Sequence, residues 1–229
     1  MKSWLIGIIS ILFLAASVSA AENIQLKSQK DKVSYAIGTN IGNNVKQLPM
    51  EIDLDILFKG FKDAVSGGKL LLSEEEMRTA MTAFQKEMAA KQTEMMKSQG
   101  EKNKKEGEAF LAENKKKEGV KTLASGLQYK VIKEGTGKTP KATDKVSTHY
   151  QGTLIDGTEF DSSYKRGEPA TFPVNGVIPG WTEALQLMKV GSKWQLFVPS
   201  KLAYGERGAG PKIGPNAVLI FTIELLAIK

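Results

Sequence analysis

Residues 176–191 read GVIPGWTEALQLMKVG and hold the only helical pattern in a region that otherwise alternates like β-strands. Apolar residues at positions 181, 184, 185 and 188 have the spacing of one face of a short helix, and Gly191 is a reasonable end for it. Trp181 stands at the start of this helix, where a bulky indole needs a packing partner. Two interpretations stay open from these residues alone: Trp181 is an ordinary core residue, or it is the floor of a pocket.

Four segments around this helix alternate with a period of two residues and predict strands. They are GLQYKVI at 126–132, KVSTHYQGTL at 145–154, SKWQLFVP at 192–199 and AVLIFTIELLAI at 217–228. Gly, Pro and Asp-Gly turns separate them. Several strands that curl over one short helix predict a small α+β domain over residues 119–229. Trp181 would then face the concave side of the sheet.

The region before this domain predicts helices. Residues 21–73 carry apolar residues at helical spacing in DKVSYAIGTNIGNNV and LDILFKGFKDAV, which indicates a helical N-terminal domain. Ser73, followed three positions later by Glu76, predicts the start of a further helix through a capping box. Because no proline follows and most residues favour helix, we expect one long connecting helix over residues 74–118.

The first part of this long helix is expected to pack against a partner, and the second part is expected to be exposed to solvent. A stripe at heptad-like spacing consists of Met77, Met81, Phe84, Met88 and Met95. A helix of this length cannot bury the stripe within a domain of about 50 residues, so we expect a homodimer; the alternative is a monomer in which the helix is a spacer. The segment 97–119 is highly charged, and we expect it to be solvated, with Gly100 and Gly107 as weak points where the helix bends or frays.

The first 20 residues have the layout of a secretory signal peptide. Lys2 is followed by an apolar run from Trp4 to Ala16 and a small-x-small ending, which predicts cleavage after Ala20. The alternative is a membrane anchor, but crossing a bilayer takes about 20 apolar residues. We therefore expect an exported, periplasmic protein, with association with the outer membrane or the cell surface left open.

The composition excludes several kinds of chemistry. The 229 residues include no cysteine, which rules out disulfides, a thiol nucleophile and a thiolate metal site. The single histidine, His149, cannot build a histidine metal site, and its place on a strand beside Tyr150 favours a structural role. No phosphate-binding, dinucleotide or zinc pattern is present, so we expect no cofactor and no metal. The net charge of +7 is thinly spread, and we expect no nucleic-acid partner.

What remains is a set of apolar and aromatic residues next to turns. In the nearby stretch GTEFDSSYKRG, residues 157–167, Asp161 and Arg166 flank a loop. Together these residues predict an aromatic-lined cavity with a few polar groups at its mouth, which is typical of sites that bind a small ligand or a single side chain. The apolar members are Tyr150, Phe160, Phe172, Val177, Ile178, Trp181, Tyr204, Ile213 and Phe221.

Three long motifs resemble the FKBP-type peptidyl-prolyl isomerases, the macrolide-binding family. They are VSTHYQGTLIDGTEFDSSYKRGEPATF, VIPGWTEALQLMKVG and LAYGERGAGPKIGPNAVLIFTIELL, and the likeness runs from about Gly126 to Lys229. The N-terminal part is similar to the FKBP_N segment of the macrophage infectivity potentiator subfamily, which implies dimerisation through residues 21–73. The resemblance also implies a twisted antiparallel sheet wrapped over one helix.

The resemblance implies a role for each residue of the cavity. The proline ring of the substrate would stack on Trp181, and Val177 and Ile178 would offer backbone hydrogen bonds. Arg166 would pair with Asp161. The catalytic set would be Tyr150, Phe160, Asp161, Trp181, Tyr204 and Phe221, and the substrate-binding set Val177, Ile178, Ile213, Phe172 and Arg166.

Two residues depart from the best-known single-domain members of that family. Ala170 stands where many have phenylalanine, and Ala209 stands in a loop where some have histidine. We expect both at the cavity edge, where they affect the range of substrates and the binding of macrolide inhibitors. The expected function is isomerisation of X–Pro bonds in unfolded or folding polypeptides outside the cytoplasm, with chaperone activity beside it. The alternative is a chaperone or adhesion module that grips chains without catalysis.

Overall fold

The computed structural model describes residues 25–229, so the predicted signal peptide lies outside the described part of the chain. The chain divides into two compact units, with the boundary between Leu71 and Leu72. No helix within residues 25–229 combines the length and the apolar character that crossing a membrane requires.

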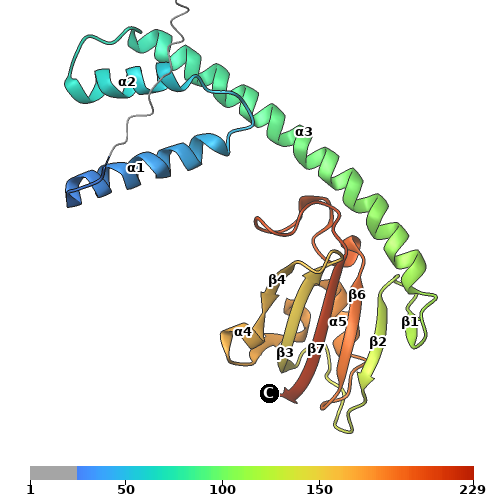
Figure 1. Ribbon diagram of the computed structural model, residues 1–229. Coiled ribbons are helices and arrows are strands. Elements are labelled where there is room, and N and C mark those ends of the chain that lie inside the picture. Colours follow the sequence, from blue (N-terminus) through green and yellow to red (C-terminus); the bar gives the residue numbers. More distant parts are fainter. Residues whose placement is uncertain (1–24) are drawn as a thin grey trace, which may run out of the picture. The chain divides into compact units, whose positions relative to one another are not determined.

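The first unit consists of two helices, α1 (Gln29–Lys46) and α2 (Leu54–Ser66) (Figure 1). Ser28 caps α1 through a capping box and Asp53 caps α2, so both helices begin where a side chain satisfies free backbone N–H groups. Gly67 ends α2 in the left-handed conformation. Neither helix has a buried residue. A single chain therefore gives these two helices no core of their own.

The second unit begins with α3 (Glu74–Asn114), a single helix of 41 residues. The predicted capping box is present: the Ser73 backbone N–H donates to the Glu76 carboxylate at 2.8 Å, and the Glu76 N–H donates to Ser73 Oγ at 3.3 Å. The helix ends earlier than predicted, since Lys115 is already its C-cap.

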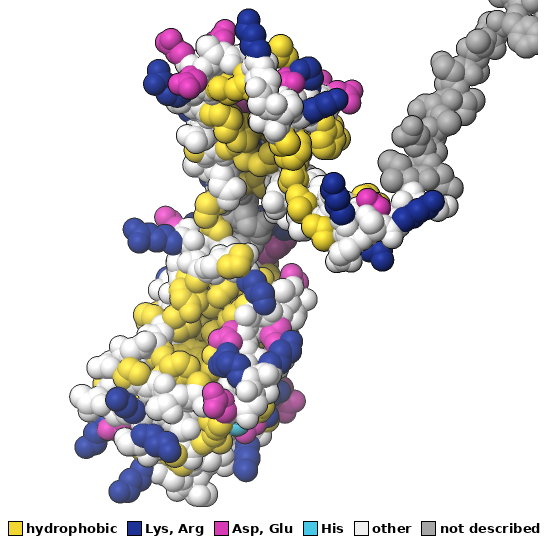
Figure 2. Space-filling model, turned by 90° about the vertical axis from the view of Figure 1, so that its left-hand side faces the viewer, with side chains coloured by type: hydrophobic (Ala, Val, Ile, Leu, Met, Phe, Trp, Pro, Cys, Tyr) yellow, Lys and Arg dark blue, Asp and Glu magenta, His cyan; other side chains and the backbone are white. Residues whose placement is uncertain are grey.

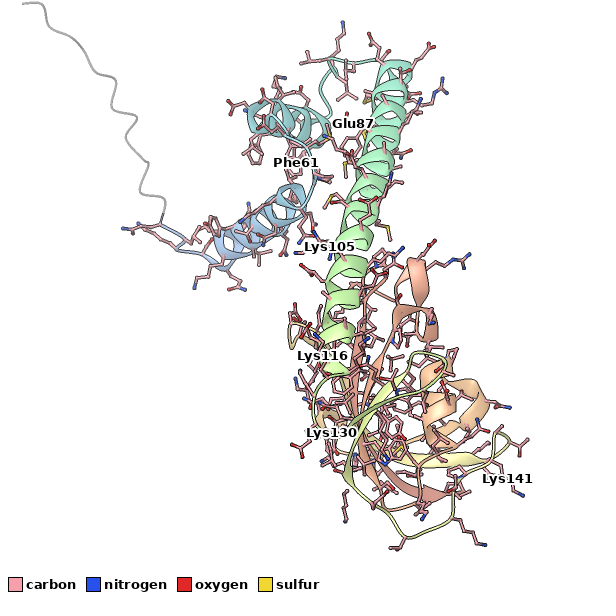
Figure 3. All side chains as sticks on the ribbon, turned by 90° about the vertical axis from the view of Figure 1, so that its right-hand side faces the viewer. Phe61, Glu87, Lys105, Lys116, Lys130 and Lys141 are labelled. Carbon is pink, nitrogen blue, oxygen red and sulfur yellow. The ribbon has the colours of Figure 1, made fainter. Side chains whose placement is uncertain are left out.

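One face of the charged end of α3 is buried, which the sequence did not indicate. The prediction of a solvated segment is wrong at Gly100, Gly107 and Asn114, all of which are buried, and the helix runs unbroken through both glycines. In Figure 3 this part of α3, between the labelled Lys105 and Lys116, runs alongside the strand-containing body. The two glycines are therefore contact points rather than weak points.

The rest of the second unit is an antiparallel sheet, which confirms the predicted α+β class. Its strand order is β1-β2-β6-β7-β3-β4, and β5 pairs with the part of β3 that β4 leaves free. The strands are β1 (Val120–Thr122), β2 (Gln128–Lys133), β3 (Lys145–Leu154), β4 (Glu159–Ser162), β5 (Ala170–Pro173), β6 (Lys193–Val198) and β7 (Leu219–Ile228). The short helices between them are α4 (Ser163–Arg166), α5 (Pro179–Leu185) and three single 3₁₀ turns at Val174–Gly176, Ser200–Leu202 and Gly205–Arg207.

The core lies between the sheet and α5. Along β7 buried and half-buried residues alternate, as the period-two pattern predicted. Pro179 occupies the first position of α5, so the helix begins two residues before the predicted start and Trp181 lies within its first turn. The helix also ends earlier, at Leu185, although Met188 remains fully buried. The largest fully buried side chains are Leu127, Leu185, Met188, Leu196, Leu219, Ile223 and Leu225.

Candidate active site

A cavity of about 900 Å³ opens between α5, the ends of β3, β4 and β7, and the loop before β7. Figure 2 shows apolar side chains gathered on the strand-containing body, with acidic and basic groups beside them. All of the predicted site residues except Arg166 line the cavity. The lining consists of Tyr150, Phe160, Asp161, Phe172, Gly176, Val177, Ile178, Trp181, Ala203, Tyr204, Ala209, Gly210, Pro211, Lys212, Ile213 and Phe221.

Trp181 both packs in the core and lines the cavity, so the two interpretations of this residue are not exclusive. Its side chain is only 4% exposed. Three rings surround the indole nearly at right angles: Tyr150 and Phe221, each with its centroid at 5.2 Å, and Phe172 at 5.9 Å. Edge-to-face packing of this kind is a favoured arrangement of aromatic pairs. The indole is therefore held in one orientation below the cavity.

The cavity wall formed by Phe160 and Phe221 depends on a glycine of β3. Phe160 packs edge-to-face on Phe221, with the ring centroids 5.5 Å apart. Gly152 lies directly across from Phe221 in the β3–β7 register. A Cβ at Gly152 would lie 2.6 Å from two atoms of the Phe160 ring and 2.8 Å from the Phe221 ring. The two rings can approach each other over the sheet only because position 152 has no side chain.

The polar rim is a three-membered hydrogen-bond network. The Tyr150 hydroxyl donates to Asp161 Oδ2 at 2.5 Å and accepts from Arg166 Nη2 at 2.8 Å. Arg166 Nη1 also pairs with Asp161 Oδ1. Arg166 thus does not line the cavity but fixes the two groups that do. The expected pairing of Arg166 with Asp161 is present.

Two family models match consecutive parts of the chain. Residues 30–131 match the model described as the domain amino terminal to FKBP-type peptidyl-prolyl isomerase. Residues 136–226 match the model of the FKBP-type peptidyl-prolyl cis-trans isomerase itself. The chain belongs to the FKBP-type peptidyl-prolyl isomerases. Its enzyme class is therefore peptidyl-prolyl cis-trans isomerase, as the resemblance implied.

Relatives resemble this isomerase over nearly its whole length. It is 50% identical over 218 residues to the outer membrane protein MIP of Legionella longbeachae, covering 95% of this chain and 94% of that protein. It is 48% identical over 229 residues to the peptidyl-prolyl cis-trans isomerase Mip of Coxiella burnetii, covering 100% of this chain and 99% of that protein. The crystal structure of FkpA from Escherichia coli superposes with a TM-score of 0.71 at 40% identity, covering 90% of this chain and 99% of that one.

The rim of the isomerase stays in one charge state around neutral pH. Burial and the hydrogen bond to Asp161 raise the pKa of Tyr150. Burial alone would raise the pKa of Asp161, but the hydrogen bonds from Tyr150 and Arg166 outweigh it and leave that pKa below its ordinary value of 3.8. Asp161 is therefore a carboxylate and Tyr150 a neutral phenol at pH 7, so neither group is poised to exchange a proton.

These pKa directions predict how activity varies with pH. Because the pKa of Asp161 is lowered by folding, its pairing contributes fully above the unfolded value of about 3.9 and is lost as the pH falls through the lower folded value. We expect kcat/KM to be constant from about pH 5 to about pH 9 and to fall only in stronger acid. The measurement is kcat/KM against pH for the wild type and Asp161→Asn. A bell-shaped profile near neutrality that Asp161→Asn abolishes would contradict this expectation.

The single histidine lies outside the cavity lining. The His149 ring stacks on Tyr164, with centroids 4.7 Å apart, and its Nδ1 lies 3.0 Å from Ser163 Oγ. Ser163 Oγ in turn accepts from the Tyr150 backbone N–H at 2.8 Å. Burial and a hydrogen bond to Glu224 raise the pKa of Tyr164 to about 12. These contacts join β3 to α4 and give His149 the structural surroundings that the sequence favoured.

Sequence reasoning missed part of the cavity of this isomerase. The lining residues that it did not name are Gly176, Ala203, Gly210, Pro211 and Lys212. Three of them, Gly210, Pro211 and Lys212, lie in the glycine-rich stretch GERGAGPKIG, from which only Ala209 and Ile213 were expected at the cavity. Of the two family departures, Ala209 lines the cavity as expected. Ala170 is not among the lining residues, although it packs against the same core as Ala209 does.

Proposed function

We propose that this isomerase is exported and accelerates X–Pro isomerisation in folding proteins by binding the proline ring over Trp181. The observation that supports this most directly is the cavity itself, whose lining is largely apolar and aromatic above a fixed indole. Sites of this type bind an apolar group and orient it through a few polar contacts. Export agrees with the signal-like sequence at residues 1–20 and with the name of the Legionella relative, an outer membrane protein.

The mechanism needs no proton transfer. Rotation about an X–Pro bond crosses a barrier of about 18–20 kcal/mol, because the planar amide must lose its resonance. The twisted transition state has less charge separation than the planar amide. An apolar cavity that excludes water therefore disfavours the planar form more than the twisted one, which is selective binding of the transition state. A ten-thousandfold acceleration corresponds to about 5.4 kcal/mol.

The cavity residues take separate roles in this proposal. Trp181 supports the proline ring, and Val177 and Ile178 offer backbone hydrogen bonds to the bound peptide. Asp161 orients and stabilises by its charge rather than as a base, since its carboxylate is already held by Tyr150 and Arg166. The apolar walls are formed by Phe160, Phe172, Ile213 and Phe221, and Tyr204 stands at the rim.

The experiment is cis-to-trans exchange of an Ala-Leu-Pro-Phe peptide by the chain from Ala21 onward. We expect exchange well above the uncatalysed rate. A second proline-containing peptide, which the assay does not detect, should compete for the cavity and slow the exchange of the first. Exchange that equals the uncatalysed rate would overturn the proposal. Exchange that is fast but insensitive to substitutions in the cavity would place the active site elsewhere.

We also propose that the isomerase is a homodimer that associates through its N-terminal domain. No residue of α1 or α2 is buried, although both helices carry large apolar side chains. Figure 2 shows apolar side chains at the surface of the helical part as well. Met81 and Met95 of the predicted stripe are also exposed in the single chain. The exposed apolar side chains of α1 and α2 include Val33, Tyr35, Ile37, Ile41, Leu54, Ile56, Phe58, Phe61 and Val65.

Sedimentation tests the dimer. We expect the chain from Ala21 to sediment with about twice its own mass, because an obligate interface buries apolar surface that water otherwise contacts. Phe61→Glu, at a side chain 56% exposed in the single chain, should shift the protein toward the monomer without changing exchange of a short peptide. A wild-type monomer would support the alternative that the long helix is a spacer.

Chaperone activity is the second candidate function. The apolar cavity and the apolar surfaces of α1 and α2 both offer contacts for an unfolded chain. If the helical part grips clients, a cavity variant should still suppress the aggregation of an unfolded protein, whereas deletion of residues 21–118 should abolish suppression. Equal suppression of aggregation by the variant that lacks residues 21–118 would mean that the cavity alone binds the unfolded protein.

A further inference from the structure

The loop before β7 has one side in the cavity and the other against α3. We call residues 208–218 the cavity loop. Its residues 209–213 line the cavity. The same loop makes its outer contacts with α3, through Pro215, Asn216 and Val218. A helix far along the sequence from the cavity therefore contacts the back of the cavity wall.

Two hydrogen bonds join α3 to the cavity loop in opposite directions. Asn103 Nδ2 on the helix donates to the Pro215 carbonyl at 2.7 Å. Asn216 Nδ2 on the loop donates to the Gly100 carbonyl at 3.3 Å. Asn103 is in turn oriented by Gln99, whose Nε2 donates to Asn103 Oδ1 at 2.7 Å. The pairing of side-chain amides with backbone carbonyls fixes where the loop lies along the helix.

Glycines on both α3 and the cavity loop allow this close approach. A Cβ at Gly107 would lie 2.6 Å from Val218 Cγ2, and a Cβ at Gly100 would lie 3.1 Å from Pro215 Cβ. Positions 100, 103 and 107 are spaced three and four residues apart, so they lie on one face of the helix. On the loop, a Cβ at Gly214 would lie 3.1 Å from Asn103 Nδ2. The contact is thus specific in shape as well as in hydrogen bonding.

Hydrogen bonds within the cavity loop connect its α3-facing side to its cavity-facing side. The backbones of Ala209 and Ile213 exchange two hydrogen bonds, of 2.8 and 3.2 Å. Asn216 has a φ of +57°, which only a few residue types tolerate, and its N–H donates to Gly205 at 2.8 Å. A shift at Pro215 or Asn216 would therefore move Ile213, which is 8% exposed and belongs to the cavity wall.

The end of α3 is itself fixed to the sheet, so the helix is a firm support. Asn114 Nδ2 donates to Gln128 Oε1 at 2.9 Å, and Gln128 Nε2 donates to the Leu111 carbonyl at 2.9 Å. Asn114 and Gln128 are 1% and 3% exposed, respectively. The Phe110 ring packs on Phe197 of β6, with centroids 6.0 Å apart. Buried hydrogen bonds of this kind are costly to break.

We propose that α3 is a positioning element of the active site, in which Asn103, Gly100 and Gly107 set the place of the Ile213 wall. The inference rests on the proposal that the cavity binds proline. Coupling between two sites is reciprocal. If the contact with α3 strengthens ligand binding by some factor, a bound ligand therefore strengthens the contact between the cavity loop and α3 by the same factor.

The test compares Asn103→Ala and Gly107→Ala with Lys104→Ala, an exposed position on the same helix, all in the chain from Ala21. We expect kcat/KM for the Ala-Leu-Pro-Phe peptide to fall about three- to tenfold in the first two, as for loss of one hydrogen bond or one fitted contact, and not in the control. The double variant Gly107→Ala/Val218→Ala removes the Cγ2 that the new Cβ would meet. It should recover much of the lost activity, because the steric cause of the loss is then gone.

A second measurement does not depend on how stable the variants are. In the wild type, saturating proline peptide should slow amide hydrogen exchange in α3 residues 99–114 as well as in the cavity loop. Two results would overturn this inference but leave the proposed function intact. One is amide hydrogen exchange in α3 that the peptide does not change. The other is wild-type kcat/KM in Asn103→Ala and Gly107→Ala, while Trp181→Leu loses activity. A wild-type chain without isomerase activity would overturn the proposed function and this inference together. If Gly107→Ala does not fold, Asn103→Ala and hydrogen exchange decide.

Discussion

We expect Trp181→Leu to lower kcat/KM for the Ala-Leu-Pro-Phe peptide by about 100-fold, which corresponds to about 2.7 kcal/mol of transition-state binding. Leucine keeps an apolar side chain in α5 but removes the flat surface under the proposed proline ring. It also removes the partner on which the edges of Tyr150, Phe172 and Phe221 rest. The measurement is exchange at a temperature at which circular dichroism shows both proteins folded.

Trp194→Leu is the matched control for this result. Trp194 is also 4% exposed, but it stacks on Tyr129 with centroids 4.4 Å apart and does not line the cavity. We expect it to destabilise the domain by about 2–4 kcal/mol, as large-to-small core substitutions do. Because Trp194 does not line the cavity, kcat/KM should stay within about twofold of wild type, a change of about 0.4 kcal/mol. Equal losses of activity in the two variants would mean that the indole of Trp181 acts only as core.

We expect Gly152→Ala to lower kcat/KM by about tenfold or more, although it adds a single methyl group. The new Cβ cannot coexist with the Phe160 and Phe221 rings where they now lie, so at least one wall of the cavity must shift. Overpacking of this kind costs about 1–3 kcal/mol. The loss is measured in the same exchange assay, together with the free energy of unfolding in urea.

Gly38→Ala provides the comparison for Gly152→Ala. Position 38 lies within α1, and nothing lies within 4 Å of a Cβ built there. The same glycine-to-alanine change should favour the helix by about 0.5–1 kcal/mol and leave kcat/KM unchanged. Wild-type activity in Gly152→Ala would show that the two rings can move apart without harm to the site.

The elements that the sequence predicted well are those whose signal is local. The Ser73–Glu76 capping box acts within one turn, and the alternation along residues 219–228 reflects a strand with one buried face. The cavity residues could be named because motifs similar to a known family carry them. Their packing around Trp181 could not be derived from spacing alone, since the rings come from β3, β5 and β7.

The parts that could not be predicted depend on contacts between distant residues. Gly107 looks like a weak point in a charged helix until Val218 is placed against it. Likewise, Lys212 has a charged side chain that does not by itself indicate a place in an apolar cavity, and only the folded loop brings it there. A glycine in a helix can thus mean either a low helix propensity or a close approach, and only the tertiary partner distinguishes the two.

Because α1 and α2 have no buried residues, the proposed association through them would make the two halves of the chain respond differently to dilution. Residues 119–229 enclose their own core, so their unfolding midpoint should not depend on protein concentration. Helices that gain a core only by association are stabilised by mass action and lose that stability as the concentration falls. A newly made chain would then fold its catalytic half as a unimolecular event, while its N-terminal half waits for an encounter with a second chain. The N-terminal half, although it is made first, would therefore complete its folding last.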